Sequence, residues 1–230
     1  MKITDFHSHI LPRADHGSDS SDTSIRQLKM ALEAGVDRIV ATPHFYPNKH
    51  TVEKFLARRE NAFASLKERL AGEDITAEIV LASEVLICHG IENLEGIEKL
   101  CIQGTRAILM EFPLQGFSND YVESIETLVR KGFDVVVAHA DRYDADNIER
   151  LVQVGAKIQL NASAIATLFK KKHLFDWMER GLVVGLGSDI HMLDKTAYRD
   201  FKKALKKINV SGYGIMEASE KLIAAAGADC

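Results

Sequence analysis

Histidine and acidic residues recur at the ends of short apolar runs throughout this chain of 230 residues. Two pairs with i, i+2 spacing frame the pattern, His7 with His9 and Asp189 with His191. Because residues i and i+2 of a strand point to the same face, each pair can offer two donors to one ion. Single residues of the same kind lie between the two pairs, and these are His16, His44, Glu84, Glu111 and His139.

A carboxylate at the buried end of a strand is costly unless it is paired or bound to a metal. The repetition of this pattern therefore predicts a metal centre. Mixed imidazole and carboxylate donors favour Mn²⁺, Zn²⁺ or Fe over the all-oxygen sites of Mg²⁺ or Ca²⁺. Two or three such ions can activate water and stabilise a leaving oxygen. This chemistry fits phosphate ester hydrolysis, and less specifically amide or ester hydrolysis.

The elements that must position these residues alternate between β-type runs and amphipathic segments. Several runs are almost continuously apolar, which is typical of parallel strands covered by helices on both faces. The predicted strands are Ile3–His7, Val36–Thr42, Ala77–Glu84, Arg106–Glu111, Phe133–His139, Lys157–Asn161 and Val183–Asp189. The predicted helices are Asp22–Ala34, Val52–Ala71, Asn119–Lys131, Asp144–Val154, Ser163–Arg180, Ala197–Lys207 and Ile215–Ala226.

The position of the candidate ligands decides between a closed α/β barrel and an open doubly wound sheet. Every predicted strand except the sixth, which ends in Asn161, has a candidate ligand at or just past its C-terminal end. In a barrel these ends converge on one mouth, whereas an open sheet gathers ligands at a single switch point. The sequence therefore predicts a distorted seven-stranded (β/α)7 barrel with the metal site at its C-terminal mouth.

Composition sets the remaining bounds. With 46% apolar and 27% charged residues, the chain is expected to form one soluble domain over residues 1–230. Its net charge of −4 gives no basic footprint for nucleic acid, and no apolar run is long enough for membrane insertion. The absence of an apolar signal segment and the three widely spaced cysteines favour a reducing, cytoplasmic location.

Five motifs together resemble the PHP (polymerase and histidinol phosphatase) superfamily. They are His7-Ser-His-Ile-Leu-Pro12, Ala41-Thr-Pro-His44, the isolated Glu84 and Glu111, His139-Ala-Asp-Arg142, and Ser188-Asp-Ile-His191. The order of these motifs and the residues within them are most similar to those of the metal-dependent protein-tyrosine phosphatases of bacterial capsule and exopolysaccharide operons. No single motif is specific, but the combination spans almost the whole chain.

The resemblance implies a trinuclear site, often loaded with Mn²⁺. It assigns His7, His9, Glu84 and Asp189 to the first ion, Glu84, Glu111 and His139 to the second, and His16, His44 and His191 to the third. Arg142 would orient the substrate phosphate through its planar fork of donors. Arg142, Asp189 and His191 are accordingly the expected catalytic residues.

The chain departs from the family pattern in the loop after the first strand. Where relatives commonly read Leu-Pro-Gly and then Asp-Asp-Gly, this chain has Leu11-Pro12-Arg13 and Asp15-His16-Gly17. Imidazole occurs at the position of His16 elsewhere in the superfamily, so the third ion is expected to be retained with altered affinity. Arg13 adds a positive charge near the mouth, which either binds phosphate or faces solvent.

The resemblance implies a manganese-dependent phosphatase whose partner is the phosphotyrosine-bearing tail of a bacterial tyrosine kinase in polysaccharide synthesis. Two alternatives stay open. One is a small-molecule phosphatase on the same site, for histidinol phosphate above all. The other is a non-catalytic scaffold, against which the full ligand set counts. A cysteine mechanism is not expected, because the run Cys101-Ile-Gln-Gly-Thr-Arg106 is one residue short of the phosphate loop of cysteine phosphatases.

Overall fold

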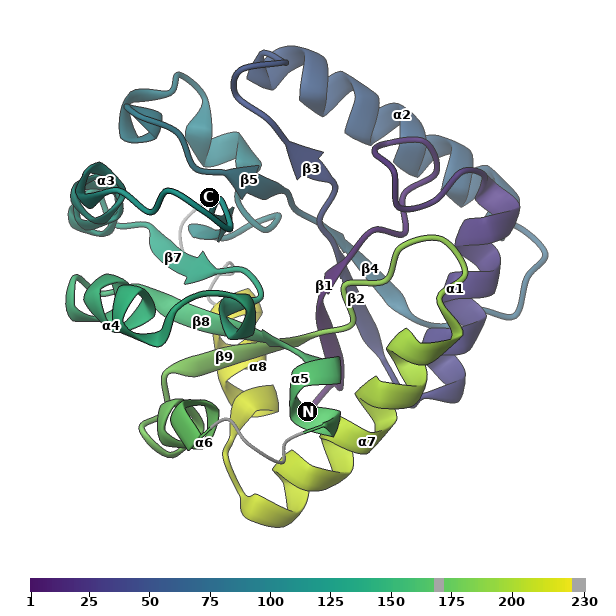
Figure 1. Cartoon of the computed structure of the whole chain (residues 1–230). Helices are drawn as coiled ribbons and strands as arrows, with labels where there is room; N and C mark the ends of the chain where they lie inside the picture. Colours follow the sequence, from purple (N-terminus) through teal and green to yellow (C-terminus); the bar gives the residue numbers. More distant parts are fainter. Residues whose placement is uncertain (168–171, 225–230) are drawn as a thin grey trace.

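The computed structural model of this chain describes residues 1–167 and 172–224, in which strands and helices alternate (Figure 1). The strands are β1 (Thr4–Ser8), β2 (Arg38–Ala41), β3 (His44–Phe45), β4 (Glu78–Leu81), β5 (Glu84–Leu86), β6 (Ala107–Glu111), β7 (Asp134–Val137), β8 (Lys157–Asn161) and β9 (Val183–Gly187). The α-helices are α1 (Ser21–Glu33), α2 (Val52–Leu70), α3 (Asn119–Arg130), α4 (Ala145–Gln153), α5 (Ala162–Ala166), α6 (Lys172–Glu179), α7 (Lys195–Ser211) and α8 (Ile215–Ala224).

The strands form two parallel sheets, one ordered β1-β2-β4 and the other β3-β5-β6-β7-β8-β9. Each of the seven predicted strand segments overlaps a strand, so the mixed α/β architecture with parallel strands is confirmed. Two of those segments run into a second, short strand, because β2 is followed by β3 and β4 by β5 after two-residue interruptions.

Pro43 explains the first interruption. Proline has no backbone N–H to donate to a ladder, so a central strand cannot run through it unbroken. Its carbonyl still accepts the N–H of Glu84 at 3.1 Å, which joins β3 to β5 immediately after the break. His44 and Glu84 are consequently register partners in neighbouring parallel strands. The break therefore sets two chemically important side chains next to each other.

The expected closed barrel of seven strands is not shown, because the ladders divide into two sheets. The two sheets nevertheless meet where β9 lies beside β1. There the N–H of Asp189 donates to the carbonyl of His7 at 2.8 Å, and the N–H of His9 donates to the carbonyl of Ile190 at 3.2 Å. These bonds hold the segment after β9 against the segment after β1.

The helices surround the strands, as Figure 1 shows for α1–α4, α6 and α7. The predicted helix over Ser163–Arg180 is observed as α5 and α6, and residues 168–171 between them lie outside the described residues. The last predicted helix is observed as α8, and the final two positions of its predicted range, like Cys230, lie outside them too. No helix among the described residues is both long and apolar enough to span a membrane.

The main apolar core lies between the strands and the helices, and a second apolar core is separate from it. It draws on strands of both sheets, including Phe6 of β1, Val40 of β2 and Val136 of β7, and Leu222 and Ile223 of α8 complete it. Glycine at position 185 of β9 allows this packing. A Cβ at Gly185 would lie 2.5 Å from the ring of Phe6, which is closer than side-chain atoms approach in folded proteins.

We expect Gly185→Ala to lower the free energy of unfolding by about 1–3 kcal/mol, since the added methyl group overpacks against the fully buried Phe6. Urea denaturation measures the change. In a Phe6→Leu background the same substitution should cost less, because the smaller side chain can move aside. Equal costs in both backgrounds would show that the contact with Phe6 is not the cause.

Candidate metal centre

The predicted site residues come together at one edge of the strands, where β1, β6, β7 and β9 end and the short strands β3 and β5 begin. β1 carries His7 with His9 just beyond it, β3 and β5 begin with His44 and Glu84, β6 ends in Glu111, His139 follows β7, and Asp189 and His191 follow β9. They surround an open cavity of about 410 Å³. Its lining comprises His16, His44, Tyr46, Glu84, Glu111, His139, Arg142, Asp189, His191 and Asp194. His7 and His9 are fully buried, next to Glu84 and Asp189 of this lining.

The group predicted for the first ion is the most compact. Nε2 of His7 lies 3.1 Å from Nε2 of His9 and 3.2 Å from Oε2 of Glu84. Oδ1 of Asp189 lies 3.7 Å and 3.4 Å from the same two nitrogens. Four donors around one ion at about 2.1 Å are separated by roughly 3.0–3.5 Å. The spacing of these donor atoms therefore fits a shared cation.

Glu84 links this group to a second one. While its Oε2 faces His7, its Oε1 lies 2.8 Å from Nε2 of His139. Oε1 and Oε2 of Glu111 lie 3.7 Å from the same nitrogen of His139 and 3.6 Å from Nδ1 of His44, respectively. The residues predicted for the second ion are thus neighbours, and Glu84 lies between the two groups.

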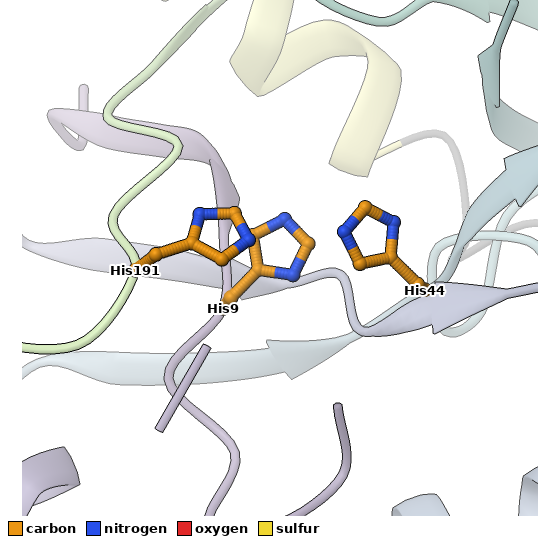
Figure 2. A group of neighbouring side chains, drawn as sticks. All are labelled: His9, His44 and His191. Atoms are coloured by element: carbon orange, nitrogen blue, oxygen red, sulfur yellow. The ribbon is translucent and has the colours of Figure 1, made fainter. Parts of the chain in front are cut away.

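A third group of side chains overlaps the set predicted for the third ion. His9, His44 and His191 have ring nitrogens within 4.8 Å of one another, and Figure 2 shows their rings side by side from three separate segments. His16, which was expected here, is exposed and stacks on the rings of His44 and His191 at centroid distances of 4.9 and 4.6 Å. His16 thus lies beside the compact group, and His9 lies within it.

Several ligand atoms in the cavity lack hydrogen-bond partners. Among the described residues, Nδ1 of His44, Oε2 of Glu84 and Nε2 of His191 are buried atoms without such a bond. The first two are only 2.9 Å apart, but their geometry is not that of a hydrogen bond. An unsatisfied buried polar atom costs about 1–3 kcal/mol, a cost that a coordinated cation would remove. This observation fits a divalent ion at the cluster.

The electrostatics of the cluster favour the anionic form of Glu84 and Asp189. Burial lowers the pKa of His7 and His9, but nearby carboxylates outweigh it and raise both. Burial raises the pKa of Glu84, but His7 and other imidazoles outweigh it and hold that pKa well below its usual range. The pKa of Asp189 is lowered in the same way against burial. Burial and the nearby charge of Glu84 raise the pKa of Glu111. Burial lowers the pKa of His191 to about 4, which keeps it in the neutral form that binds metals.

Two candidate ligands sit in strained backbone. His139 and Asp189 have φ angles of 32° and 51°, in the left-handed region that non-glycine residues rarely adopt. Such strain costs of the order of 1–3 kcal/mol and is concentrated at functional sites. At both positions the chain has just left a strand, so the turn directs the side chain toward the cavity.

A layer of hydrogen-bonding residues behind the ligands was not predicted from the sequence. Asp15 accepts a hydrogen bond from Nδ1 of His9 at 2.6 Å and from the backbone N–H of His44 at 3.0 Å. The hydroxyl of Tyr143 lies 3.1 Å from Nδ1 of His139. Such partners orient metal-binding imidazoles.

A buried amide pair on β8, Gln159 and Asn161, belongs to the same layer of hydrogen-bonding residues. Its i, i+2 spacing in an apolar strand is the sequence signal that could have revealed it.

Other candidate residues are divided between the cavity and its surroundings. Arg142 ends the short 3₁₀ turn Ala140–Arg142, lines the cavity and donates to Oδ2 of Asp189. Tyr46 lies beside His44, with ring centroids 5.3 Å apart. Arg13 is exposed, and its Nε donates to the carbonyl of Asp19 rather than lining the cavity. Arg142 is therefore the guanidinium best placed for a bound anion.

The cysteine motif is not part of this site. Cys101 is buried, and burial raises the pKa of its thiol to about 12. A nucleophilic cysteine requires the opposite shift. Arg106, which would have to hold the phosphate, donates instead to the backbone carbonyls of Lys131 and Gly132. The expectation that this segment does not form a phosphate loop agrees with these contacts.

Two proteins of similar sequence are named as tyrosine-protein phosphatases. The chain is 30% identical over 198 residues to the tyrosine-protein phosphatase YwqE of Bacillus subtilis, an alignment covering 82% of this chain and 77% of YwqE. It is 26% identical over 243 residues to the tyrosine-protein phosphatase CpsB of Streptococcus pneumoniae, covering 96% and 95% of the two chains.

A solved structure of these phosphatases is also similar to this chain. The structure described as one of YwqE and CpsB, "unique metal-dependent tyrosine phosphatases", matches with a TM-score of 0.82 and 27% identity, over 96% of this chain and 94% of that one. The predicted resemblance to bacterial metal-dependent tyrosine phosphatases is confirmed. The family model for capsular polysaccharide synthesis proteins, CpsB/CapC, matches residues 3–220, and the chain belongs to this family.

Proposed function

We propose that this protein is a metal-dependent phosphatase that hydrolyses phosphotyrosine in proteins. The observation that carries the proposal is the cluster of imidazole and carboxylate donors around Glu84, with Arg142 at its edge. Membership of a family whose relatives are tyrosine-protein phosphatases supports the substrate class. The nine predicted ligands, His7, His9, His16, His44, Glu84, Glu111, His139, Asp189 and His191, would hold two or three divalent ions, of which Mn²⁺ is our first choice.

When bound, divalent ions activate water and stabilise the phosphoryl oxygens during hydrolysis. The residues of the chain prepare the cavity for this chemistry. Glu84 and Asp189 are anionic and would repel a phosphate dianion, so cations are needed before a phosphoester can enter. Arg142 adds a fixed positive charge at the edge, where its guanidinium can hold and orient two phosphate oxygens. Asp189 keeps that guanidinium in place through their ion pair.

An aromatic phosphoester suits the open mouth better than a compact small molecule. The cavity is open to solvent, and the half-buried ring of Tyr46 lies beside the candidate ligand His44. The phenol of phosphotyrosine is also a better leaving group than a serine alkoxide. Histidinol phosphate on the same site is the main alternative, and the relatives named as tyrosine-protein phosphatases weigh against it.

The proposal extends to the partner and the setting. The substrate would be the phosphorylated tail of a bacterial tyrosine kinase in polysaccharide synthesis, encountered in the cytoplasm. We also infer that residues 1–230 act as one domain and that the two sheets work as one distorted seven-stranded barrel. Support for the barrel comes from the hydrogen bonds between the segments after β1 and β9, and from the second apolar core, to which both sheets contribute.

Metal removal is the first test. Treatment with a chelator should abolish phosphatase activity, because the carboxylates of the cavity would then repel the substrate and no ion would activate water. Readdition of Mn²⁺ should restore activity better than Mg²⁺ or Ca²⁺, given the imidazole donors. Elemental analysis of the active protein should find two or three ions per chain. Full activity in a preparation free of metal would rule the mechanism out.

Substrate preference is the second test. The Mn²⁺-loaded protein should hydrolyse a phosphotyrosine peptide with a higher kcat/KM than a phosphoserine peptide of the same sequence or histidinol phosphate. Steady-state phosphate release measures all three rates. A strong preference for histidinol phosphate over every phosphotyrosine peptide would replace the proposal by its small-molecule alternative.

Arg142→Ala should lower kcat/KM for phosphotyrosine peptides by about ten-fold to a thousand-fold, the range for one charge-assisted contact to a reacting group. The metal content should not change, since guanidinium is not a ligand. Arg180→Ala is the matched control, because Arg180 is likewise a partly exposed arginine paired with a carboxylate, that of Glu149, but it does not line the cavity. Wild-type kinetics for Arg142→Ala would show that the ions alone hold the phosphate.

A further inference from the structure

β8 is the strand whose C-terminal end carries no predicted ligand, yet two amide side chains lie there. Gln159 has no exposed surface and Asn161 is only 4% exposed. Buried amides are expensive unless each donor and acceptor is paired. Their pairing therefore shows what this strand contributes to the cavity.

The carbonyl oxygen of Gln159 determines which nitrogen of His7 carries a proton. Oε1 of Gln159 lies 2.6 Å from the backbone nitrogen of His139, which can only donate. The same oxygen lies 3.1 Å from Nδ1 of His7, so this nitrogen must also be the donor. When His7 is in the neutral form that binds a metal, its lone pair is then on Nε2, the atom that faces Glu84 at 3.2 Å. The bond to His139 also holds that residue in its strained backbone conformation.

The amide NH2 group of Gln159 is linked to Asp189 through Asn161. Nε2 of Gln159 donates to Oδ1 of Asn161 at 3.1 Å, and Nδ2 of Asn161 donates to Oδ2 of Asp189 at 3.0 Å. One carboxylate oxygen of Asp189 is thereby occupied, and Oδ1 is left toward His9 at 3.4 Å. The two amides thus control residues that follow β7 and β9 as well as one on β1.

We propose that Gln159 and Asn161 are a positioning pair, which presents Nε2 of His7 and Oδ1 of Asp189 to a divalent cation. This inference rests on the metal-binding part of the proposed function. The space for the pair depends on Gly187, where a Cβ would lie 2.5 Å from Nε2 of Gln159 and 2.7 Å from Cβ of His7. Neither amide is a ligand, so their contribution is to orientation alone.

Titration of the metal-free protein with Mn²⁺ tests the pair without any use of activity. Gln159→Met keeps the size of the side chain but removes both hydrogen-bonding ends, and it should weaken the tightest Mn²⁺ binding about ten-fold to a hundred-fold. Asn161→Ala should have a similar effect through Asp189 alone. Ser219→Ala is the control, because it removes another buried side-chain hydrogen bond, to the carbonyl of Val184, far from the pair in sequence and outside the cavity.

Nitrogen NMR of the metal-free protein separates positioning from simple loss of stability. At alkaline pH, where His7 is neutral, it should carry its proton on Nδ1 in the wild type, in Asn161→Ala and in Gln159→Glu, which retains an acceptor oxygen. Gln159→Met should shift the proton toward a mixture of both nitrogens. A folded Gln159→Met protein with wild-type Mn²⁺ affinity and an unchanged His7 tautomer overturns the inference.

Two further experimental outcomes, a variant that does not fold and a wild type that binds no ion, can also be interpreted. If Gln159→Met does not fold, Asn161→Ala decides: weaker Mn²⁺ binding with an unchanged His7 tautomer supports the pair, and wild-type affinity overturns it. If the wild type binds no divalent ion, the proposed function fails, while the His7 tautomer in Gln159→Glu and Gln159→Met still tests the positioning pair.

Discussion

The carboxylate of Glu84 is almost completely removed from solvent, and its charge is the constraint on which the site depends. A buried anion left without partners would destabilise the protein by several kcal/mol. Here imidazoles from three other segments surround it: His7 on β1, His44 on β3 and His139 after β7. None of these is near Glu84 in sequence, so the anion is tolerated only when the strand ends converge.

Behind the ligands, hydrogen bonds decide which atom of each ligand faces the cavity. Asp15 holds Nδ1 of His9, and the backbone carbonyl of Asp189 holds Nδ1 of His191. Each ring then presents its Nε2 to the cluster. An imidazole that was free to flip would present either nitrogen, with a loss of affinity for any bound ion. The outer layer therefore converts a group of histidines into a directed set of donors.

The residues that are chemically conspicuous were predictable from the sequence. His and Glu at the ends of apolar runs have few other reasons to be there, and all nine predicted ligands border or underlie one cavity. The strand break at Pro43 could have been inferred from the proline itself. The placement of His9 beside His44 and His191 was not predictable, because it depends on how two loops fold over the strand ends. Gln159 and Asp15 were missed because an ordinary polar residue gains its role only from its tertiary partners.

The hydrogen bonds between the segments after β1 and β9 have a consequence for when the site forms during protein synthesis. The N–H of Ser188 donates to the buried carboxylate of Asp5 across 183 residues of sequence, and Asp189 follows immediately. Contacts of such long range form late, since a large loop must close first. During synthesis the ribosome therefore releases the first histidines long before their carboxylate partner exists. The proposed first ion site would therefore be complete only when nearly the whole polypeptide has been made.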